Sequence, residues 1–435
     1  MKKISKFSFY TLDDGKNMLL YNSYIGRNSL CKISDSNIIS AIIAKDLSNL
    51  PANILNKLYE KGIVVDDSED ENAKLYSQFL DVVAPRTLHL IINPTERCNF
   101  RCKYCYETFK NGEMPIEIQK RIINYVRDNI HKYSGLSVSW FGGEPLLAKE
   151  SLEYLSEQFI SICKFNKRQY WADMTTNGYL LDLNTFQRML ALRIRSFQIT
   201  IDGVESIHDR QRITAIGGKT YQRIYQNLMQ IKKTRRSNFN IVIRTNFTKE
   251  IFEHFGEYLD NIGVLCESDG RFSIACYKVG KWSDSISSDL VSNLILNASD
   301  GMKEIYRKIL DSGKKIKIRS DYLDPGSGLC YGGKKNNFVI SADGTIHKCT
   351  LDFEDPGSIV GRIFNNQMQY NDRYFKYISN SERCKLYYDC FFAPACTGDP
   401  CPLKSKEERR CSFVKDNLDL VLKILDQAKP FDYIS

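Results

Sequence analysis

Short apolar segments alternate with longer amphipathic stretches between about residues 84 and 315. The candidate strands are 88–92, 136–140, 171–175, 197–201, 241–244 and 272–275, and helical patterns such as 116–130 and 221–232 lie between them. A repeated strand–helix unit predicts a parallel sheet. Six units predict an α/β fold with a partial (β/α)6 barrel of the TIM type, whose chemistry collects at the C-terminal ends of the strands.

The chain has 435 residues, 43% hydrophobic and 26% charged, which excludes a disordered or fibrous protein. At roughly 100–200 residues per domain, this length predicts two to four domains. We divide it into residues 1–83, 84–315 and 316–435, because the last part loses regular periodicity and gains glycine and cysteine.

Neither a membrane-crossing run nor a signal-peptide core is visible in the sequence. The formal charge of +9 is spread along the chain, with only short basic runs such as 232–236. We therefore expect a cytoplasmic protein that binds neither nucleic acid nor membrane.

The first part predicts a hairpin followed by two helices. Segments 6–10 and 18–21 flank Asp13-Asp14-Gly15, which supplies turn residues. Ser36 can cap a first helix, and Pro51 can open a second that ends at Gly62.

Residues 63–65 then predict a strand, and the acidic stretch 66–71 predicts a solvated linker. One interpretation of residues 1–83 is a small structural cap. The other is a module with an exposed strand edge that accepts a peptide as an extra strand.

Fourteen cysteines in a reducing compartment indicate metal or cluster ligation, redox chemistry or core packing rather than disulfides. Cys98, Cys102 and Cys105 follow the first barrel strand in a C-x3-C-x2-C loop. Three thiolates at this spacing can hold three irons of a cubane cluster and leave the fourth iron open. A zinc site is the alternative, although zinc sites more often use C-x2-C pairs with a fourth ligand near by.

This loop, its place after the first strand and Tyr104 before the last cysteine resemble the radical S-adenosylmethionine (radical SAM) enzymes. The resemblance implies that Cys98, Cys102 and Cys105 ligate a 4Fe-4S cluster whose open iron is chelated by S-adenosylmethionine. It also implies reductive cleavage of that molecule to a 5′-deoxyadenosyl radical, which abstracts a hydrogen atom.

Residues 141–145 follow the second strand and look like the family's Gly-Gly-Glu-Pro turn. By that resemblance Gly142, Gly143 and Glu144 approach the amino group of the cofactor, and glycine permits a close approach.

Asn177 follows the third strand, and Thr200 and Asp202 lie at the end of the fourth. These polar side chains lie where the resemblance places a ribose. Arg212 is similar to an arginine that faces the cofactor carboxylate in peptide-modifying members. An ordinary surface or ion-paired arginine is the alternative for Arg212.

The C-terminal cysteines resemble the SPASM extension, which binds two auxiliary 4Fe-4S clusters. Cys330, Gly344 and Cys349 form a C-x13-G-x4-C arm, followed by Cys384, Cys390, Cys396, Cys401 and Cys411. The family pattern would place a cysteine at Tyr387, where this chain instead has Cys384. The resemblance implies an inner cluster on Cys330, Cys349 and Cys401, and an outer cluster on Cys384, Cys390, Cys396 and Cys411.

The inner set lacks one protein ligand, because relatives with a complete set carry a cysteine where this chain has Asn336. We hypothesise an open iron that takes a substrate thiolate. Alternatively, Cys276 or an aspartate fills the position. The other cysteines, Cys31, Cys163, Cys266 and Cys276, have no ligand spacing and are expected in the core.

The combination resembles maturases of ribosomally synthesised, post-translationally modified peptides (RiPPs). The implied function is hydrogen abstraction from a precursor peptide to form a thioether or carbon–carbon crosslink. The implied partners are a leader peptide bound at a winged-helix-like N-terminal module and a flavodoxin or ferredoxin reductant. No catalytic side chain beyond the cluster ligands is assigned.

Three alternatives remain. Sulfatase-type maturation of a Cys or Ser to formylglycine is disfavoured, because the family's aspartate after the cysteine is replaced by Thr350. Asp352 is displaced by two positions, too far for the same proton transfer. Activation of a partner enzyme and simple electron transfer are the other two.

Overall fold

The computed structural model describes residues 2–13, 17–107, 109, 111–279, 300–351, 356–379, 387–398 and 411–434. The chain divides into two compact units. The first comprises 1–84, 309–334 and 378–435, and the second 85–308 and 335–377. This division does not test the three functional modules expected from the sequence, which stay a prediction. No helix in the described ranges is both long and apolar enough to cross a membrane.

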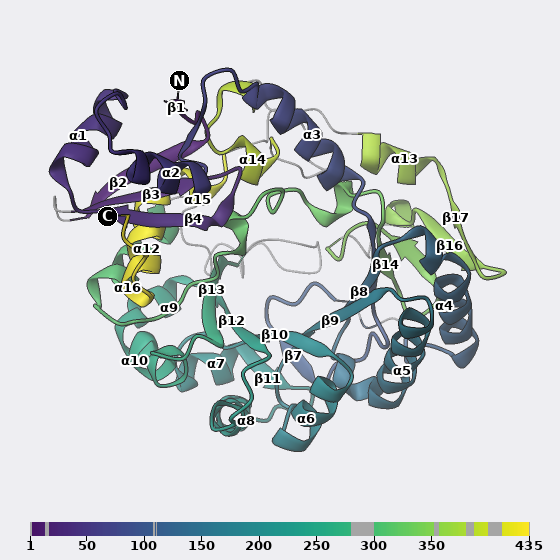
Figure 1. Ribbon diagram of the computed structural model, residues 1–435. Helices are drawn as coiled ribbons and strands as arrows, with labels where there is room; N and C mark the ends of the chain where they lie inside the picture. The colour runs from purple at the N-terminus through teal and green to yellow at the C-terminus, as the bar shows by residue number, and fades with distance from the viewer. Residues whose placement is uncertain are drawn as a thin grey trace. The chain divides into compact units, whose positions relative to one another are not determined.

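The first unit contains a three-stranded antiparallel sheet, a two-stranded sheet and several helices (Figure 1). Its strands are β1 (Lys2–Ile4), β2 (Ser8–Asp13), β3 (Asn17–Asn22), β4 (Gly26–Ile33) and β5 (Val64–Asp66). Its helices are α1 (Ser36–Ala44), α2 (Ala52–Glu60), α3 (Glu71–Val83), η3 (Asp321–Leu323), η4 (Tyr331–Gly333), η6 (Tyr387–Asp389), α14 (Ala393–Cys396), α15 (Phe413–Asp416) and α16 (Leu418–Ala428).

The hairpin and both predicted helices are present in this unit. β2 pairs with β3. Pro51 precedes α2, and this helix ends before Gly62, whose φ is 70°. The cap of α1 is Asp35 rather than Ser36, because the Asp35 carboxylate accepts hydrogen bonds from the backbone N–H groups of Asn37 and Ile38. The prediction of Ser36 as the cap was therefore wrong by one residue.

The acidic stretch 66–71 is not a solvated linker. Asp66 ends β5, Asp70 caps α3 with hydrogen bonds from two backbone N–H groups, and Glu71 is only 7% exposed. The prediction failed because short-range charge density does not reveal which carboxylate has a buried partner.

The three-stranded sheet has two edges, β2 and β4. On the β4 edge the C-terminal segment is bonded to Lys32, whose N–H donates to the Asp432 carbonyl at 3.0 Å and whose carbonyl accepts from Ile434 N–H at 2.9 Å. Within the described ranges, β2 has no second partner strand. Tyr10 and Leu12 on β2 are 42% and 40% exposed.

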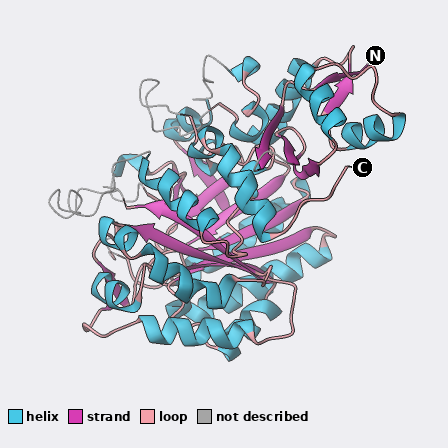
Figure 2. Ribbon diagram, turned by 90° about the vertical axis from the view of Figure 1, so that its left-hand side faces the viewer, coloured by secondary structure: helices cyan, strands magenta, loops and turns pink. Residues whose placement is uncertain are grey.

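The second unit is built on a ten-stranded sheet, covered by helices along its length (Figures 1 and 2). The strands of this unit are β6 (Thr87–Ile92), β7 (Phe100–Cys102), β8 (Gly135–Trp140), β9 (Gln169–Thr176), β10 (Ile194–Thr200), β11 (Arg212–Thr214), β12 (Asn240–Phe247), β13 (Phe272–Lys278), β14 (Asn337–Ile340), β15 (Thr345–His347), β16 (Gly361–Phe364) and β17 (Gln367–Tyr370). Of these, β7 and β11 form a separate two-stranded sheet. Its helices are η1 (Ile130–Lys132), η2 (Pro145–Ala148), η5 (Pro356–Ser358), α4 (Ile116–Asn129), α5 (Lys149–Phe165), α6 (Leu183–Ala191), α7 (Glu205–Gln211), α8 (Tyr221–Lys232), α9 (Lys249–Glu253) and α10 (Phe255–Cys266). Two further helices, α12 (Asp300–Asp311) and α13 (Asp372–Ser379), each cross a boundary between the units.

All six predicted strands are present as β6, β8, β9, β10, β12 and β13, and each pairs in parallel with the next. The register sets Ile92 beside Trp140 and Trp140 beside Met174. The loops that follow these strands therefore emerge at one edge of the sheet, as parallel pairing requires.

The sheet continues beyond β6 into the C-terminal part of the chain. β14 pairs in parallel with β6, and β15, β16 and β17 extend the sheet in antiparallel order. Residues 335–377 thus share a core with the parallel strands.

Candidate functional site

The three clustered cysteines lie in the loop after β6. Cys102 ends β7, opposite Arg212 of β11. Cys105 N–H donates to the Cys102 carbonyl at 3.1 Å, and Phe100 N–H donates to Cys98 Sγ at 3.4 Å. Burial raises the pKa of Cys98 and of Cys105 to about 12 each, so these thiols keep their protons until a metal displaces them.

The Gly-Gly pair after β8 packs against the backbone of the cysteine loop. Gly142 has a φ of 107°, and a Cβ there would lie 2.4 Å from the Thr95 carbonyl oxygen. A Cβ on Gly143 would lie 2.4 Å from the Arg97 carbonyl oxygen and 2.5 Å from that of Glu96. Only glycine therefore lets this turn lie against the loop.

Glu144 is completely buried beside this contact. Its carboxylate accepts hydrogen bonds from Thr176 Oγ1 at 2.7 Å, Asn177 N–H at 2.7 Å and Leu146 N–H at 3.1 Å. Burial raises the pKa of Glu144 above its usual value, and these donors oppose that rise. The carboxylate is thus held by the end of β9 and by the first turn of η2.

Asn177 joins the end of β9 to the cysteine loop. Its side chain donates to Asn99 Oδ1 at 2.8 Å and accepts from Tyr179 N–H at 3.0 Å. Thr200, the last residue of β10, is 8% exposed. The structure therefore brings Asn177 into contact with the loop and leaves Thr200 at the neighbouring strand end.

Asp202 is the centre of a second buried network. Its carboxylate accepts from Asn246 N–H at 2.7 Å and from the Tyr104 hydroxyl, and it lies 3.8 Å from Arg212 Nη1. Arg212 also donates to the Tyr104 hydroxyl at 2.8 Å. Tyr104, Asp202 and Arg212, three of the predicted cofactor residues, are therefore in direct contact.

The electrostatics of this network follow from its burial. Burial raises the pKa of Asp202, although the Arg212 charge opposes the rise. Burial alone would lower the pKa of Arg212, but Cys102, Tyr104 and Asp202 raise it above its usual value. Arg212 is 6% exposed and ion-paired with Asp202, so it is not a surface arginine, and its role toward a cofactor carboxylate stays a prediction.

The sequence analysis missed three polar residues of this region: Asn93, His208 and Asn246. Both side-chain polar atoms of Asn93, which follows β6 and lies next to Gly142, are buried and have no hydrogen-bond partner among the described residues. His208 accepts a hydrogen bond from Asp202 N–H at 3.1 Å, and its Nε2 has no partner in the part of the chain that the structure describes. No local pattern marks these residues, because only the tertiary structure buries them.

The residues fit a cluster with a small polar ligand. Soft thiols are the donors that iron–sulfur clusters use, and burial of Asn93 and of Arg212 Nε without partners indicates polar groups that a bound molecule would satisfy. Across the described ranges, no group of three His, Cys, Asp or Glu side chains is arranged to hold one metal ion. Each cysteine of a cubane site binds a different iron. The absence of a site for a single metal ion among the described residues therefore does not test the cluster.

The C-terminal cysteines are only partly described. Cys384 and Cys401 lie outside the described residues, as does Asp352. Cys330, Cys390, Cys396 and Cys411 belong to the first unit and Cys349 to the second.

Two contacts group cysteines within the first unit. Lys415 donates to Cys411 Sγ at 3.3 Å and also interacts electrostatically with Cys390. Gly328 N–H donates to the Ala395 carbonyl at 2.8 Å, which brings the segment before Cys330 against α14. In the second unit, Asn336 donates to the Pro85 carbonyl at 2.7 Å.

The remaining cysteines are buried, as predicted. Cys31, Cys163, Cys266 and Cys276 are between 0% and 9% exposed. Burial raises the pKa of Cys276 to about 12, which is typical of an inert core thiol.

Comparisons with known proteins find similarity in the region around the cysteine loop. Residues 92–259 match the family model described as the radical SAM superfamily. The chain is 23% identical over 366 residues to the serine-type anaerobic sulfatase-maturating enzyme of Bacteroides thetaiotaomicron, covering 73% of this chain and 83% of that one. Over 181 residues, or 39% of this chain, it is 26% identical to a Synechocystis protein of unassigned function, and it spans 45% of that protein's length.

The fold also matches a solved structure. The structure of anSMEcpe with bound AdoMet and Cp18Cys peptide superposes with a TM-score of 0.59 at 19% identity, covering 79% of this chain and 97% of that chain. At this identity the likeness concerns the fold.

Proposed function

We propose, from the radical SAM domain that residues 92–259 contain, that this chain is a peptide maturase that forms a crosslink in a precursor peptide. The observation that carries the proposal is the packing of the cysteine loop against the Gly142–Gly143 turn, with Glu144 buried beside it. The peptide substrate rests on the sulfatase-maturating relative and on the peptide named in the anSMEcpe structure.

In this proposal Cys98, Cys102 and Cys105 hold a 4Fe-4S cluster, and Glu144 binds the amino group of S-adenosylmethionine. When bound, these groups supply a 5′-deoxyadenosyl radical that abstracts a hydrogen atom. Asp202 holds Tyr104 and Arg212 in place, and Arg212 presents its Nε toward an anionic group.

The C-terminal cysteines form two auxiliary clusters in the proposal, and the bond formed is a thioether or a carbon–carbon link. The N-terminal module binds the leader part of the peptide, and a flavodoxin or ferredoxin supplies the electron. Leader binding by strand addition would raise the effective concentration of the reacting residue near the radical.

A second candidate is formylglycine formation, favoured by the match to the sulfatase-maturating enzyme over 73% of this chain. Thr350, where sulfatase maturases have an aspartate, argues against it. Turnover on a sulfatase-derived peptide with the mass change of formylglycine would establish this candidate instead.

The proposal is tested first by metal content. After anaerobic reconstitution, roughly twelve irons per chain falling to about eight in the triple Cys98, Cys102 and Cys105 alanine variant indicate one cofactor cluster and two auxiliary clusters. Cys163→Ala is the matched control, because this cysteine is buried in the core. About four irons falling to none would remove both auxiliary clusters from the proposal.

The second measurement is turnover. Wild-type protein with dithionite and S-adenosylmethionine should release 5′-deoxyadenosine, and a peptide encoded beside the gene should lose hydrogen by mass. Iron loss in the triple variant without loss of 5′-deoxyadenosine release would refute the assigned cofactor site.

A further inference from the structure

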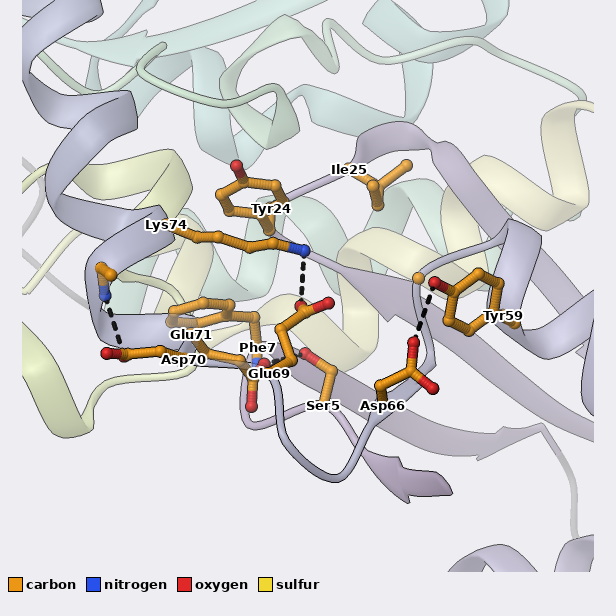
Figure 3. A network of polar contacts seen from close by, with 12 residues as sticks. Ser5, Phe7, Tyr24, Ile25, Tyr59, Asp66, Glu69, Asp70, Glu71 and Lys74 are labelled. Atoms are coloured by element: carbon orange, nitrogen blue, oxygen red, sulfur yellow. Dashed lines mark hydrogen bonds and ion pairs between the residues drawn. The ribbon is translucent and has the colours of Figure 1, made fainter. Parts of the chain in front are cut away.

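A cavity of about 190 Å³ lies in the first unit, between β1, β3, β5, α2 and α3. Tyr24, Tyr59 and Phe7 form aromatic walls, and Glu69, Glu71 and Lys74 are its ionisable lining residues. Figure 3 shows these side chains around one space, with Lys74 reaching to Glu69. The volume is below the roughly 300 Å³ at which small-molecule sites begin, so it fits a single side chain.

Glu71 is the unusual group in this wall. It is 7% exposed and accepts hydrogen bonds from Ser5 Oγ at 2.6 Å and from Lys6 N–H at 3.3 Å. Both donors are neutral, and within the described ranges no cation lies within 4.0 Å of the Glu71 carboxylate. A buried carboxylate is ordinarily paired, because burying an isolated charge is costly.

Glu69 differs, since it is ion-paired with Lys74 at 2.6 Å. The Lys74 side chain is 46% exposed and its ammonium lies 5.9 Å from the centre of the Tyr24 ring. On the other wall, Lys2 Nζ lies 3.6 Å from the centre of the Tyr59 ring. The chain's own ammonium groups thus already interact with both tyrosines, as cation–π attraction favours.

The charge of the lining follows from these pairings. The lining residues carry two carboxylates and one ammonium, which is one net negative charge. Outside the lining, Lys2 is paired with Asp66 at 2.8 Å, Lys3 donates to the Glu69 carbonyl at 3.4 Å, and Lys6 bonds the Asn72 side chain and the Tyr388 carbonyl. One cation bound inside the cavity would neutralise the charge of the lining residues. The wall is also rigid, because the Asn22 side chain donates to the Gly62 carbonyl at 2.7 Å and accepts from Tyr24 N–H at 2.9 Å.

We propose that this cavity binds the cationic side chain of a basic residue, preferably arginine, in the peptide on which the protein acts. The peptide as its source rests on the proposed function, whereas the cation site rests on the cavity itself. Arginine is preferred because a planar guanidinium can bond two carboxylates, here Glu71 and Glu69, at once. The site anchors part of the substrate in the first unit.

The test measures binding of N-acetyl-L-arginine amide to the full chain, with N-acetyl-L-citrulline amide as the uncharged probe of nearly the same shape. We expect saturable binding of the arginine probe and at least about tenfold weaker binding of the citrulline probe. Equal affinity for both probes, or no saturable binding of the arginine probe at millimolar concentration, overturns the proposal.

Three variants locate the binding. Glu71→Gln should weaken arginine binding about tenfold or more. Lys74→Gln should strengthen it, because the competing ammonium is removed. Glu60→Gln, an exposed position on α2, should change nothing.

Unchanged affinity in both Glu71→Gln and Lys74→Gln overturns the assignment to this cavity. If Glu71→Gln does not fold, the Lys74 variant and the citrulline comparison still decide. Binding of the probes needs neither the cluster nor S-adenosylmethionine. The arginine probe can therefore fail to bind while 5′-deoxyadenosine release persists, and it can bind while that release is absent.

Discussion

Gly143→Ala should uncouple the cysteine loop from the turn that carries Glu144. The added Cβ would lie 2.4 Å from the Arg97 carbonyl oxygen, about 1.0 Å closer than the 3.4 Å at which ordinary contact begins. The obstructing atoms are backbone carbonyls, which cannot rotate away as a side chain can. The loop and the turn must therefore separate by about 1 Å.

A displacement of about 1 Å at a reacting site can lower a rate about a hundredfold. Overpacking of this kind also typically destabilises a protein by about 1–3 kcal/mol. The assay is the initial rate of 5′-deoxyadenosine release from reconstituted protein with dithionite, alongside the thermal unfolding midpoint. We expect a large loss of rate with a modest fall in the midpoint.

Gly270→Ala is the matched control, because a Cβ there would meet no atom within 4 Å. It should leave both readouts at their wild-type values. If Gly143→Ala releases 5′-deoxyadenosine within twofold of the wild type, the close packing of turn and loop does not position the reacting groups, and the reasoning fails.

Three further substitutions test the buried polar groups. Glu144→Gln should weaken S-adenosylmethionine binding about 10–100-fold through loss of a charge-assisted hydrogen bond, which equilibrium binding checks. The amide NH2 group would face either Asn177 N–H or Leu146 N–H, so the substitution should also cost about 1–3 kcal/mol of unfolding free energy in the metal-free protein, which thermal unfolding checks. Asp202→Asn leaves Arg212 as a buried charge without its anion and should cost about 3 kcal/mol of unfolding free energy, so an unchanged midpoint would contradict the ion pair's structural role. Burial lowers the pKa of His208 well below 6.5, so the unfolded chain binds the extra proton and stability falls as the pH drops below 6.5, by up to about 1.4 kcal/mol per pH unit. Unfolding midpoints between pH 5 and 7.5 should show less acid sensitivity for His208→Asn than for the wild type or the exposed control His254→Asn.

Much of the parallel sheet could be predicted because its strands are short apolar runs. Along strands such as β8 and β9 fully buried residues alternate with less buried ones, and this period of two marks a strand in the sequence. The order of the loops then follows, because parallel strands place their C-terminal ends at one edge. The cysteine loop was found from its cysteine spacing, and Glu144 and Asn177 from the family resemblance; the strand order explains why the structure brings them together.

Residues whose role depends on distant partners could not be predicted. Glu71 appears in an acidic run, and its buried hydrogen bonds come from Ser5 and Lys6, 66 and 65 positions away. Asn93 precedes a proline and resembles a turn residue in the sequence. The two glycines were expected to face a cofactor, but the backbone of residues 95–97 already requires them.

The pairing of β7 with β11 has a consequence for biogenesis. Tyr104 and Arg212, which this pairing brings into contact, lie 108 positions apart in the chain. Contacts between such distant segments form late, after the intervening chain has been ordered. In a growing polypeptide the cysteine loop therefore lacks β11, the partner strand of β7, until residue 214 has left the ribosome. Insertion of iron and sulfide into the final geometry of the loop must follow synthesis of that strand.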